Sequence, residues 1–126
     1  MRKISLDRLS ALFGAINESR ALYLPVDNRK TTSYERWDES KELSEAPNSS
    51  RSPKDLFFPQ TEELMEFKVD GKKIEIHDLR RESEDFVVFG VRACDVRSLD
   101  VLDRVFLSEP RDTFYENRRE HGTIMS

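Results

Sequence analysis

Apolar residues near the start of the chain recur with the period of a helix. Leucine, phenylalanine and isoleucine return every three or four positions between residues 6 and 16, and charged or amide residues occupy the other faces. This spacing predicts an amphipathic helix over about residues 6–18, with Ser5 as its N-cap. The next segment, ALYLPV, predicts a short strand. Pro25 cannot donate to a sheet ladder, so we expect it at a sheet edge or at the strand's end.

Residues 28–54 have no sustained helical or strand period of apolar residues and almost no aliphatic side chains. A connection of that length is unusual inside a compact domain unless it is functional or poorly packed. We expect a long irregular segment with Tyr34 and Trp37 as its large anchors. The preferred interpretation is a solvated excursion held by one aromatic side chain, and the alternative is a functional loop.

The clearest local signal is MEFKVDGKKIEIHDL. Apolar residues alternate with polar ones on both sides of Asp70 and Gly71, which is typical of a hairpin with a two-residue turn. This turn predicts that Phe67 lies opposite Ile74 and that Met65 lies opposite Ile76. The lysines and glutamates between them would then face water.

A continuous apolar run at residues 86–91 predicts a central strand covered on both faces. An amphipathic helix over 95–107 follows, with Asp95 as its N-cap, and then a short helix in RDTFYENRRE and a strand at 122–125. The two strands and the intervening helices form a crossover, which should be parallel and right-handed. The predicted fold class is mixed α/β: a small mixed sheet with a β-hairpin and one βαβ crossover flanked by helices.

Composition narrows the class of protein. The 126 residues suggest one domain, 1–126, and the net charge is −4 with no basic stripe, so nucleic acid is not an expected partner. No apolar run approaches the roughly 18 residues that a membrane helix needs, so no membrane contact is expected. A single cysteine favours a reducing, cytoplasmic setting. The final residues, EHGTIMS, look like the start of a strand, and we expect the chain to be the N-terminal fragment of a longer protein.

The single cysteine, Cys94, is the strongest candidate for chemistry. It lies in VRACD, at the carboxyl end of a predicted parallel strand, which is where α/β proteins place their sites. The start of the next helix and Arg92 both favour a thiolate, the form that binds metal or attacks an electrophile, while Asp95 opposes it. A buried structural cysteine is the alternative, because free cysteine is among the most buried residue types.

Other candidate groups give weaker signals. Neither His77 nor His121 is tied to Cys94 by spacing, and CxxC patterns are absent, so this chain alone cannot hold a cluster. Arg118 and Arg119 end a predicted helix, where a cation suits the helix dipole. Their alternative role is an anionic contact to a cluster, a flavin phosphate or a partner subunit.

Three separated blocks of the sequence match one family pattern in the same order. The matching residues are Ser52, Pro53, Lys54, Phe58, Pro59 and Glu62; Gly90, Val91, Arg92, Cys94, Asp95, Leu102, Asp103, Val105, Phe106 and Leu107; and Asp112, Tyr115, Arg118, Arg119 and Glu120. Through these blocks the chain resembles the N-terminal region of iron–sulfur electron-transfer subunits, a family that includes a subunit of anaerobic sulfite reductase and the beta subunit of cytoplasmic nickel–iron hydrogenases of the sulfhydrogenase type. One departure from the family pattern is Ala93, where many relatives have proline.

The resemblance implies a scaffold and docking domain of an electron-transfer subunit in a cytoplasmic oxidoreductase complex. Members of the family continue into a cysteine-rich region with [4Fe–4S] clusters, so Cys94 would supply one of the four thiolates of a cluster in the full-length protein. Arg92, Asp95, Arg118 and Arg119 would lie near the cofactor. No catalytic residue is expected in this part, and no cluster is expected in this fragment.

The resemblance also implies other subunits of such a complex as partners. An excised domain exposes the surface that the rest of the protein covers, so we expect an apolar patch near Ile124 and Cys94 that could support a homodimer. Two rival functions remain open at this point. One is a protein-interaction module with a buried, inert cysteine and no redox role; the other is a small thiol enzyme or redox sensor, which would need a base near Cys94.

Overall fold

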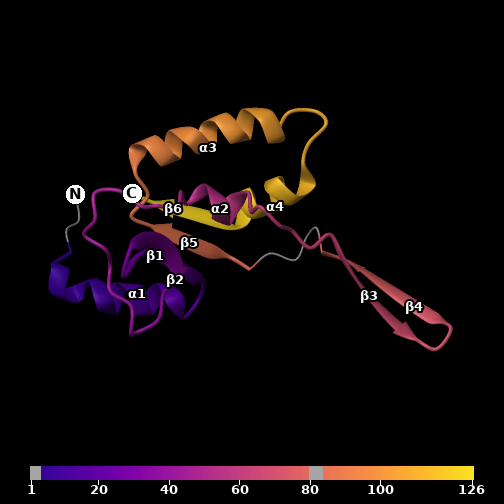
Figure 1. Ribbon diagram of the computed structural model, residues 1–126, viewed down its shortest axis with the longest axis horizontal. Helices are drawn as coiled ribbons and strands as arrows, with labels where there is room; N and C mark the ends of the chain where they lie inside the picture. The colour runs from indigo at the N-terminus through magenta and orange to yellow at the C-terminus, as the bar shows by residue number, and fades with distance from the viewer. Residues whose placement is uncertain (1–3, 80–83) are drawn as a thin grey trace.

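The computed structural model describes residues 4–79 and 84–126. These residues form a four-stranded mixed sheet with helices on both faces, and a separate β-hairpin, so the predicted mixed α/β class is confirmed (Figure 1). The helices are α1 (Leu9–Asn17), preceded by a 3-10 turn at Leu6–Arg8, α2 (Lys54–Phe57), α3 (Ala93–Phe106) and α4 (Thr113–His121). The strands are β1 (Ala21–Asn28), β2 (Thr31–Arg36), β3 (Met65–Asp70), β4 (Lys73–Asp78), β5 (Phe86–Phe89) and β6 (Gly122–Met125).

The sheet has the order β2-β1-β5-β6. Strands β1, β5 and β6 run parallel to one another, and the outermost strand β2 pairs antiparallel with β1. The predicted parallel crossover from β5 through helices to β6 is therefore confirmed, and β5 is a central strand as its apolar run predicts. Because β1, β5 and β6 are parallel, their carboxyl ends reach the same edge of the sheet.

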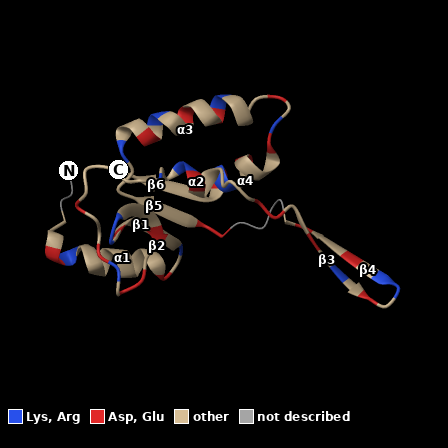
Figure 2. Ribbon diagram, viewed as in Figure 1, with Lys and Arg blue, Asp and Glu red and all other residues tan. Residues whose placement is uncertain are grey.

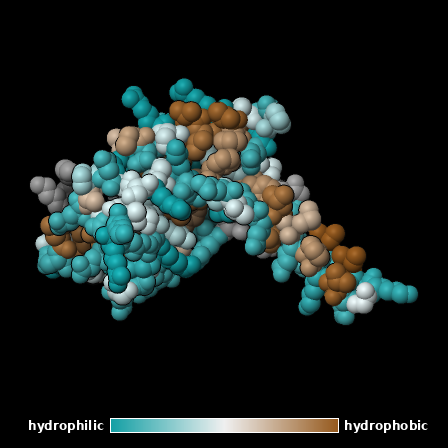
Figure 3. Space-filling model, in the orientation of Figure 1, coloured by the Kyte–Doolittle hydropathy of each residue, from teal (hydrophilic) through white to brown (hydrophobic). Residues whose placement is uncertain are grey.

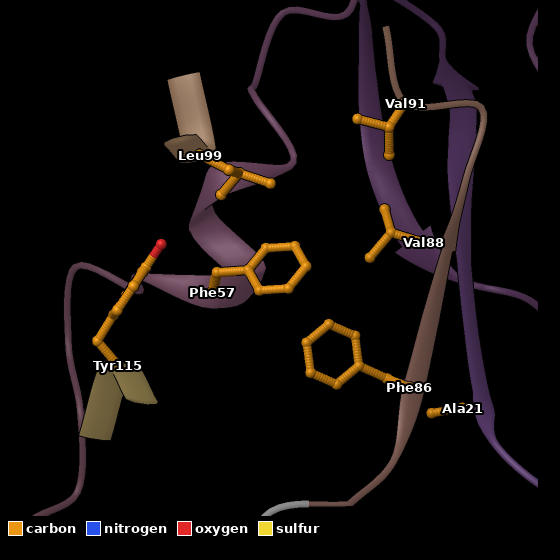
Figure 4. Packing of buried hydrophobic residues seen from close by; sticks show 7 residues of the cluster. All are labelled: Ala21, Phe57, Phe86, Val88, Val91, Leu99 and Tyr115. Atoms are coloured by element: carbon orange, nitrogen blue, oxygen red, sulfur yellow. The ribbon is translucent and has the colours of Figure 1, made fainter. Parts of the chain in front are cut away.

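Alternation along the strands divides the core into two clusters, one on each face of the sheet. Ala21, Phe86 and Val88 face α2, α3 and α4, where they pack against the apolar sides of those helices (Figure 4). The intervening residues Leu22 and Val87 face α1 and belong to a cluster with Phe13, Leu24, Val26 and Trp37. Successive strand side chains point to opposite faces, so a sheet covered on both sides needs apolar residues in both sets.

The first helix forms where the apolar period places it, but its start differs in detail. Ser5 precedes the 3-10 turn, and its hydroxyl donates to the carboxylate of Asp7 rather than accepting from a backbone N–H. Arg8 occupies the position before α1 and makes no capping bond through its side chain. Ser5 is thus the residue at the start of the helical segment without being a side-chain cap.

The junction after β5 also differs from its prediction. The strand ends at Phe89 instead of residue 91, because Gly90 adopts a positive φ of 75° that turns the chain. Helix α3 then begins at Ala93, with Arg92 in the N-cap position. The prediction that Asp95 is the N-cap is wrong: Asp95 lies inside the first turn of the helix.

Pro25 lies in the middle of a strand that is longer than predicted. Pairing between β1 and β5 covers only residues 21–23, so Pro25 lies past the last paired residue on that side. A Cβ at Gly90 would stand 3.4 Å from the Pro25 Cδ atom, which shows that the pyrrolidine ring fills the space beside the turn. The missing N–H therefore costs no ladder bond to β5.

The segment 28–54 is less irregular than its sequence suggests. Residues 31–36 form β2, which pairs along β1 from Tyr23↔Arg36 to Asn28↔Thr31. The sequence TTSYER gives no apolar alternation because only Thr32 on this edge strand is buried. Trp37 is an anchor as predicted: it is 8% exposed, and its ring packs edge-on against Phe13.

The hairpin forms, but its register differs from the prediction. Gly71 and Lys72 make the two-residue turn, with Gly71 at a φ of 59°, so Phe67 pairs with Ile76 and Val69 pairs with Ile74. The turn is one residue later than Asp70-Gly71, because glycine at the first loop position suits a tight hairpin. The shift keeps the apolar residues on one face. That face is exposed, as is the rest of the hairpin.

Candidate functional site

Cys94 is presented at the edge of the sheet where the parallel strands end. It follows β5 and the turn at Gly90, and it occupies the first turn of α3. Met125 ends β6 at the same edge, since its carbonyl accepts a hydrogen bond of 3.1 Å from the Val91 N–H. The thiol is free and exposed. The interpretation of Cys94 as a buried packing residue is therefore wrong.

Arg92 joins this edge to the segment between β2 and α2. Its guanidinium donates to the carbonyl of Ala46 over 3.2 Å and to Oδ1 of Asn48 over 3.4 Å. These bonds hold the guanidinium against backbone from another part of the chain, two residues from the thiol. Arg92 thus links the start of α3, two residues before Cys94, to the segment that contains Ala46 and Asn48.

Asp95 is held in place from the same segment. Its Oδ1 atom accepts a hydrogen bond of 2.9 Å from the Ser52 hydroxyl, and its Oδ2 atom lies 4.0 Å from the Cys94 sulfur. The first turn of a helix favours a carboxylate because the free backbone N–H groups carry partial positive charge. Asp95 therefore places a negative charge and a hydrogen-bond acceptor next to the thiol.

Tyr34 completes the arrangement from β2. Its hydroxyl donates to the carbonyl of Gly90 over 2.9 Å, which holds the turn that leads to Cys94. Burial raises the pKa of the Tyr34 phenol, and the negative charges of Asp95 and Cys94 act in the same direction, while Arg92 opposes them. Tyr34 is therefore a neutral donor that positions the turn, close enough to the site to respond to its charges.

Residues 37–53 pass along the end of the sheet where the parallel strands finish, and hydrogen bonds hold them at several separate points. The Ser44 hydroxyl donates to Asp27 over 2.7 Å, and the Ser50 N–H donates to the carbonyl of Thr32 over 2.7 Å. The bonds from Arg92 and Ser52 add two more points. An excursion held by one aromatic side chain therefore does not describe this segment.

Two residues of this site are not recognisable as site residues from the sequence. The sequence marks Tyr34 only as an anchor, and it marks Ser52 only as part of a block that carries the family resemblance. Their contacts cross 56 and 43 residues of chain, so no local pattern could join them to Cys94. The block around Ser52 is the one signal that points to this segment.

Arg118 and Arg119 lie elsewhere. They belong to α4, which leads into Gly122 at the start of β6, whereas Cys94 follows the ends of the parallel strands. Arg118 donates to Glu62 over 2.7 Å, and Arg119 donates to Asp103 over 3.0 Å. The structure thus brings together Arg92, Cys94 and Asp95, and it places Arg118 and Arg119 at the opposite edge of the sheet, each with a carboxylate partner.

The histidines do not supply a base at the thiol. His121 lies beside the first residue of β6, with its Nδ1 atom 2.6 Å from Oδ1 of Asp85, and this contact lowers the pKa of the Asp85 carboxyl. His77 lies on β4 of the hairpin. Within residues 4–79 and 84–126, no three histidine, cysteine, aspartate or glutamate side chains gather closely enough to hold a metal ion.

Comparison with known proteins gives one informative relative. The chain is 31% identical over 123 residues to sulfhydrogenase 2 subunit beta of Pyrococcus furiosus (strain ATCC 43587 / DSM 3638 / JCM 8422 / Vc1). The match supports a relation to hydrogenase beta subunits. It covers 98% of this chain and 36% of the relative, so the chain spans about a third of the relative's length. No family model and no solved structure matches the chain.

A [4Fe–4S] cluster needs more ligands than this site contains. Such a cluster takes four thiolates, and this chain has a single cysteine, so its own residues do not make a complete cluster site. The site offers one exposed thiol with the Asp95 carboxylate 4.0 Å from its sulfur, and Arg92 precedes the thiol by two residues. In the part of the chain that the structure describes, no helix is both long and apolar enough to cross a membrane.

Proposed function

We propose that this chain is the scaffold and docking domain of an electron-transfer subunit in a hydrogenase-type oxidoreductase complex. The observation that carries the proposal is the placement of Cys94: the chain's one thiol is exposed at the edge where three parallel strands end. Similarity to a sulfhydrogenase beta subunit supports the hydrogenase type over the sulfite reductase type. The chain itself performs no reaction in this proposal.

Cys94 serves as one thiolate ligand of a [4Fe–4S] cluster whose other ligands come from outside these 126 residues. A ligand of this kind must present its sulfur outward, because cysteines from another segment or another polypeptide must reach the same cluster. The exposed thiol on a helix end meets that requirement, and a buried thiol would not. Arg92, two residues before the ligand, ties the start of α3 to the segment between β2 and α2 through Ala46 and Asn48.

The remaining predicted residues take different roles in this proposal. Asp95 sets the orientation of the first helical turn through Ser52, next to the ligand. Arg118 and Arg119 join α4 to Glu62 and Asp103, so they support the fold at the opposite end of the sheet. The partners are other subunits of the complex.

The test uses the affinity-tagged chain, isolated without oxygen together with the polypeptides that accompany it. Cys94→Ser should lower the iron content by about four atoms per complex, since a four-thiolate site then lacks one ligand. Ser98→Ala is the control: it removes a hydroxyl on the same helix that bonds only the Asp95 carbonyl, and iron should stay at the wild-type level. Full iron loading and unchanged electron transfer in Cys94→Ser would refute the proposal.

A further inference from the structure

The β3–β4 hairpin extends from the body of the protein and carries an uncovered apolar face (Figures 1 and 3). Its five large apolar residues are between 59% and 67% exposed. Register places them together, because Phe67 pairs with Ile76 and Val69 pairs with Ile74. Met65 extends this face toward the body of the protein. We call this surface the hairpin face; it consists of Met65, Phe67, Val69, Ile74 and Ile76.

This surface differs from the patch that the sequence predicts near Ile124 and Cys94. Ile124 is partly buried and packs against the core cluster under α3. Among the described residues, the large exposed apolar side chains instead lie mainly on the hairpin and on the outer side of α3. The hairpin is therefore the stronger candidate for an interface.

A hairpin of this kind gains from being covered. A two-stranded sheet alone is marginally stable in water and needs further strands or an apolar partner surface. A large apolar residue offers on the order of 150–200 Å² when fully exposed, so the hairpin face presents roughly 500–600 Å² of surface. Patches of that size on soluble proteins usually mark a binding surface.

We propose that the hairpin face binds the same face of a second copy of this chain, related by a two-fold axis. Two such faces would bury roughly 1,000–1,200 Å² in total, which is the lower limit for a specific interface. A contact of this size is typical of a weak, reversible dimer. Pairing through the strand edges instead would leave both apolar faces in water.

Charge on the hairpin is compatible with this arrangement. The four central residues of its apolar face, Phe67, Val69, Ile74 and Ile76, have no charged neighbour on that face, and the opposite face pairs Lys68 with Glu75 and Asp70 with Lys73. Lysines and acidic residues lie along the hairpin, as Figure 2 shows. The one carboxylate on the apolar face is Asp78, which pairs with Met65 at the base of the hairpin, so two copies that run in opposite directions keep their Asp78 side chains at opposite ends of the contact.

The experiment measures the mass of the 126-residue chain by sedimentation velocity from about 1 to 500 µM. The wild-type chain should shift from monomer to dimer over this range. Ile76→Lys should raise the dissociation constant at least about tenfold, because it places a charge in the contact. His77→Lys is the matched control: it adds a similar charge one residue away on the opposite face, and dimerisation should persist.

A second measurement locates the contact and shows that the variants fold. Photo-cross-linking from a benzoylphenylalanine at Phe67 should join two copies through residues 64–76 of the second copy. Fluorescence of the single tryptophan, Trp37, reports the fold of the body, where it is buried apart from the hairpin. A chain that stays monomeric, a dimer that survives Ile76→Lys, or cross-links only to other parts of the second copy would each overturn the proposal.

Discussion

Gly122 lies where α4 passes into β6, and the space beside it is already full. A Cβ atom at this position would stand 2.7 Å from Cζ of Phe86 and closer still to Cε1 of Phe57. Its φ of −89° is an ordinary backbone conformation, so any cost of Gly122→Ala comes from these rings and not from backbone strain. The variant therefore isolates one packing contact in the core.

The size of the effect follows from the distances. Carbon atoms in favourable contact lie about 3.5–4.0 Å apart, so the Phe57 ring must move by roughly 1 Å or the strand must move away from it. Phe57 is fully buried and packs against Phe86 with 5.2 Å between ring centroids, which leaves little room for either ring to turn. Overpacking of this kind costs about 1–3 kcal/mol. The lower entropy of the unfolded chain offsets about 0.4–1 kcal/mol of that cost.

The assay is urea denaturation followed by Trp37 fluorescence, with far-ultraviolet circular dichroism as a second probe of two-state behaviour. Gly122→Ala should lower the free energy of unfolding by about 1–2 kcal/mol. Gly14→Ala is the control, because nothing lies within 4 Å of a Cβ there and the residue is inside α1. That variant should gain about 0.5–1 kcal/mol from helix propensity.

The contrast between the two variants is what the reasoning predicts. If Gly122→Ala were as stable as the wild type, or more stable, the close approach of β6 to the two aromatic rings would be wrong. A loss in both variants would instead mean that the effect of alanine does not depend on the space around it.

Two further predictions concern polar contacts. Asp103 accepts from the Tyr115 hydroxyl at 2.6 Å and from Arg119 at 3.0 Å, so Asp103→Asn should lower the free energy of unfolding by about 1–3 kcal/mol in thermal denaturation. Tyr115→Phe should cost less, because it leaves the Asp103–Arg119 ion pair in place, and a larger cost would contradict the assignment. The hydroxyls of Thr32 and Ser44 donate hydrogen bonds to the Asp27 carboxylate and lower its pKa. Its contribution is therefore present above the unfolded pKa near 4 and is lost as the pH falls through the lower folded value. Thr32→Val should flatten the loss of stability in acid, and an acid profile equal to that of the wild type would count against this contact.

Much of the fold could be predicted because it depends on local periods. The apolar segment ALYLPV identifies the strand β1, the apolar run in β5 identifies a strand covered on both faces, and the spacing of apolar residues identifies α1 and α3. The hairpin is also recognisable, although its turn is one residue later than the Asp-Gly pair suggests. The hairpin also shows that burial does not follow from alternation alone. Alternating apolar residues normally mark a buried side of a strand, but the apolar side of this hairpin is exposed.

The features that the sequence does not reveal depend on distant partners. Strand β2 is polar, and it is a strand because β1 offers it a partner. The segment after it is fixed by Arg92 and Ser52, whose bonds cross more than forty residues of chain. The sequence predicts the position of Cys94 at the end of the parallel strands. The exposure of its thiol depends on where the segment after β2 lies against the start of α3, which no local pattern predicts.

In the proposed complex, the outward-facing thiol of Cys94 is occupied by iron. The most direct test of this role is the rate of alkylation of Cys94 by iodoacetamide, measured by mass spectrometry of the peptide that contains it. The thiol should react readily in the isolated folded chain, become protected in the iron-loaded complex, and regain reactivity when a chelator removes the iron. A thiol that reacts equally fast in the iron-loaded complex and in the isolated chain would contradict the account.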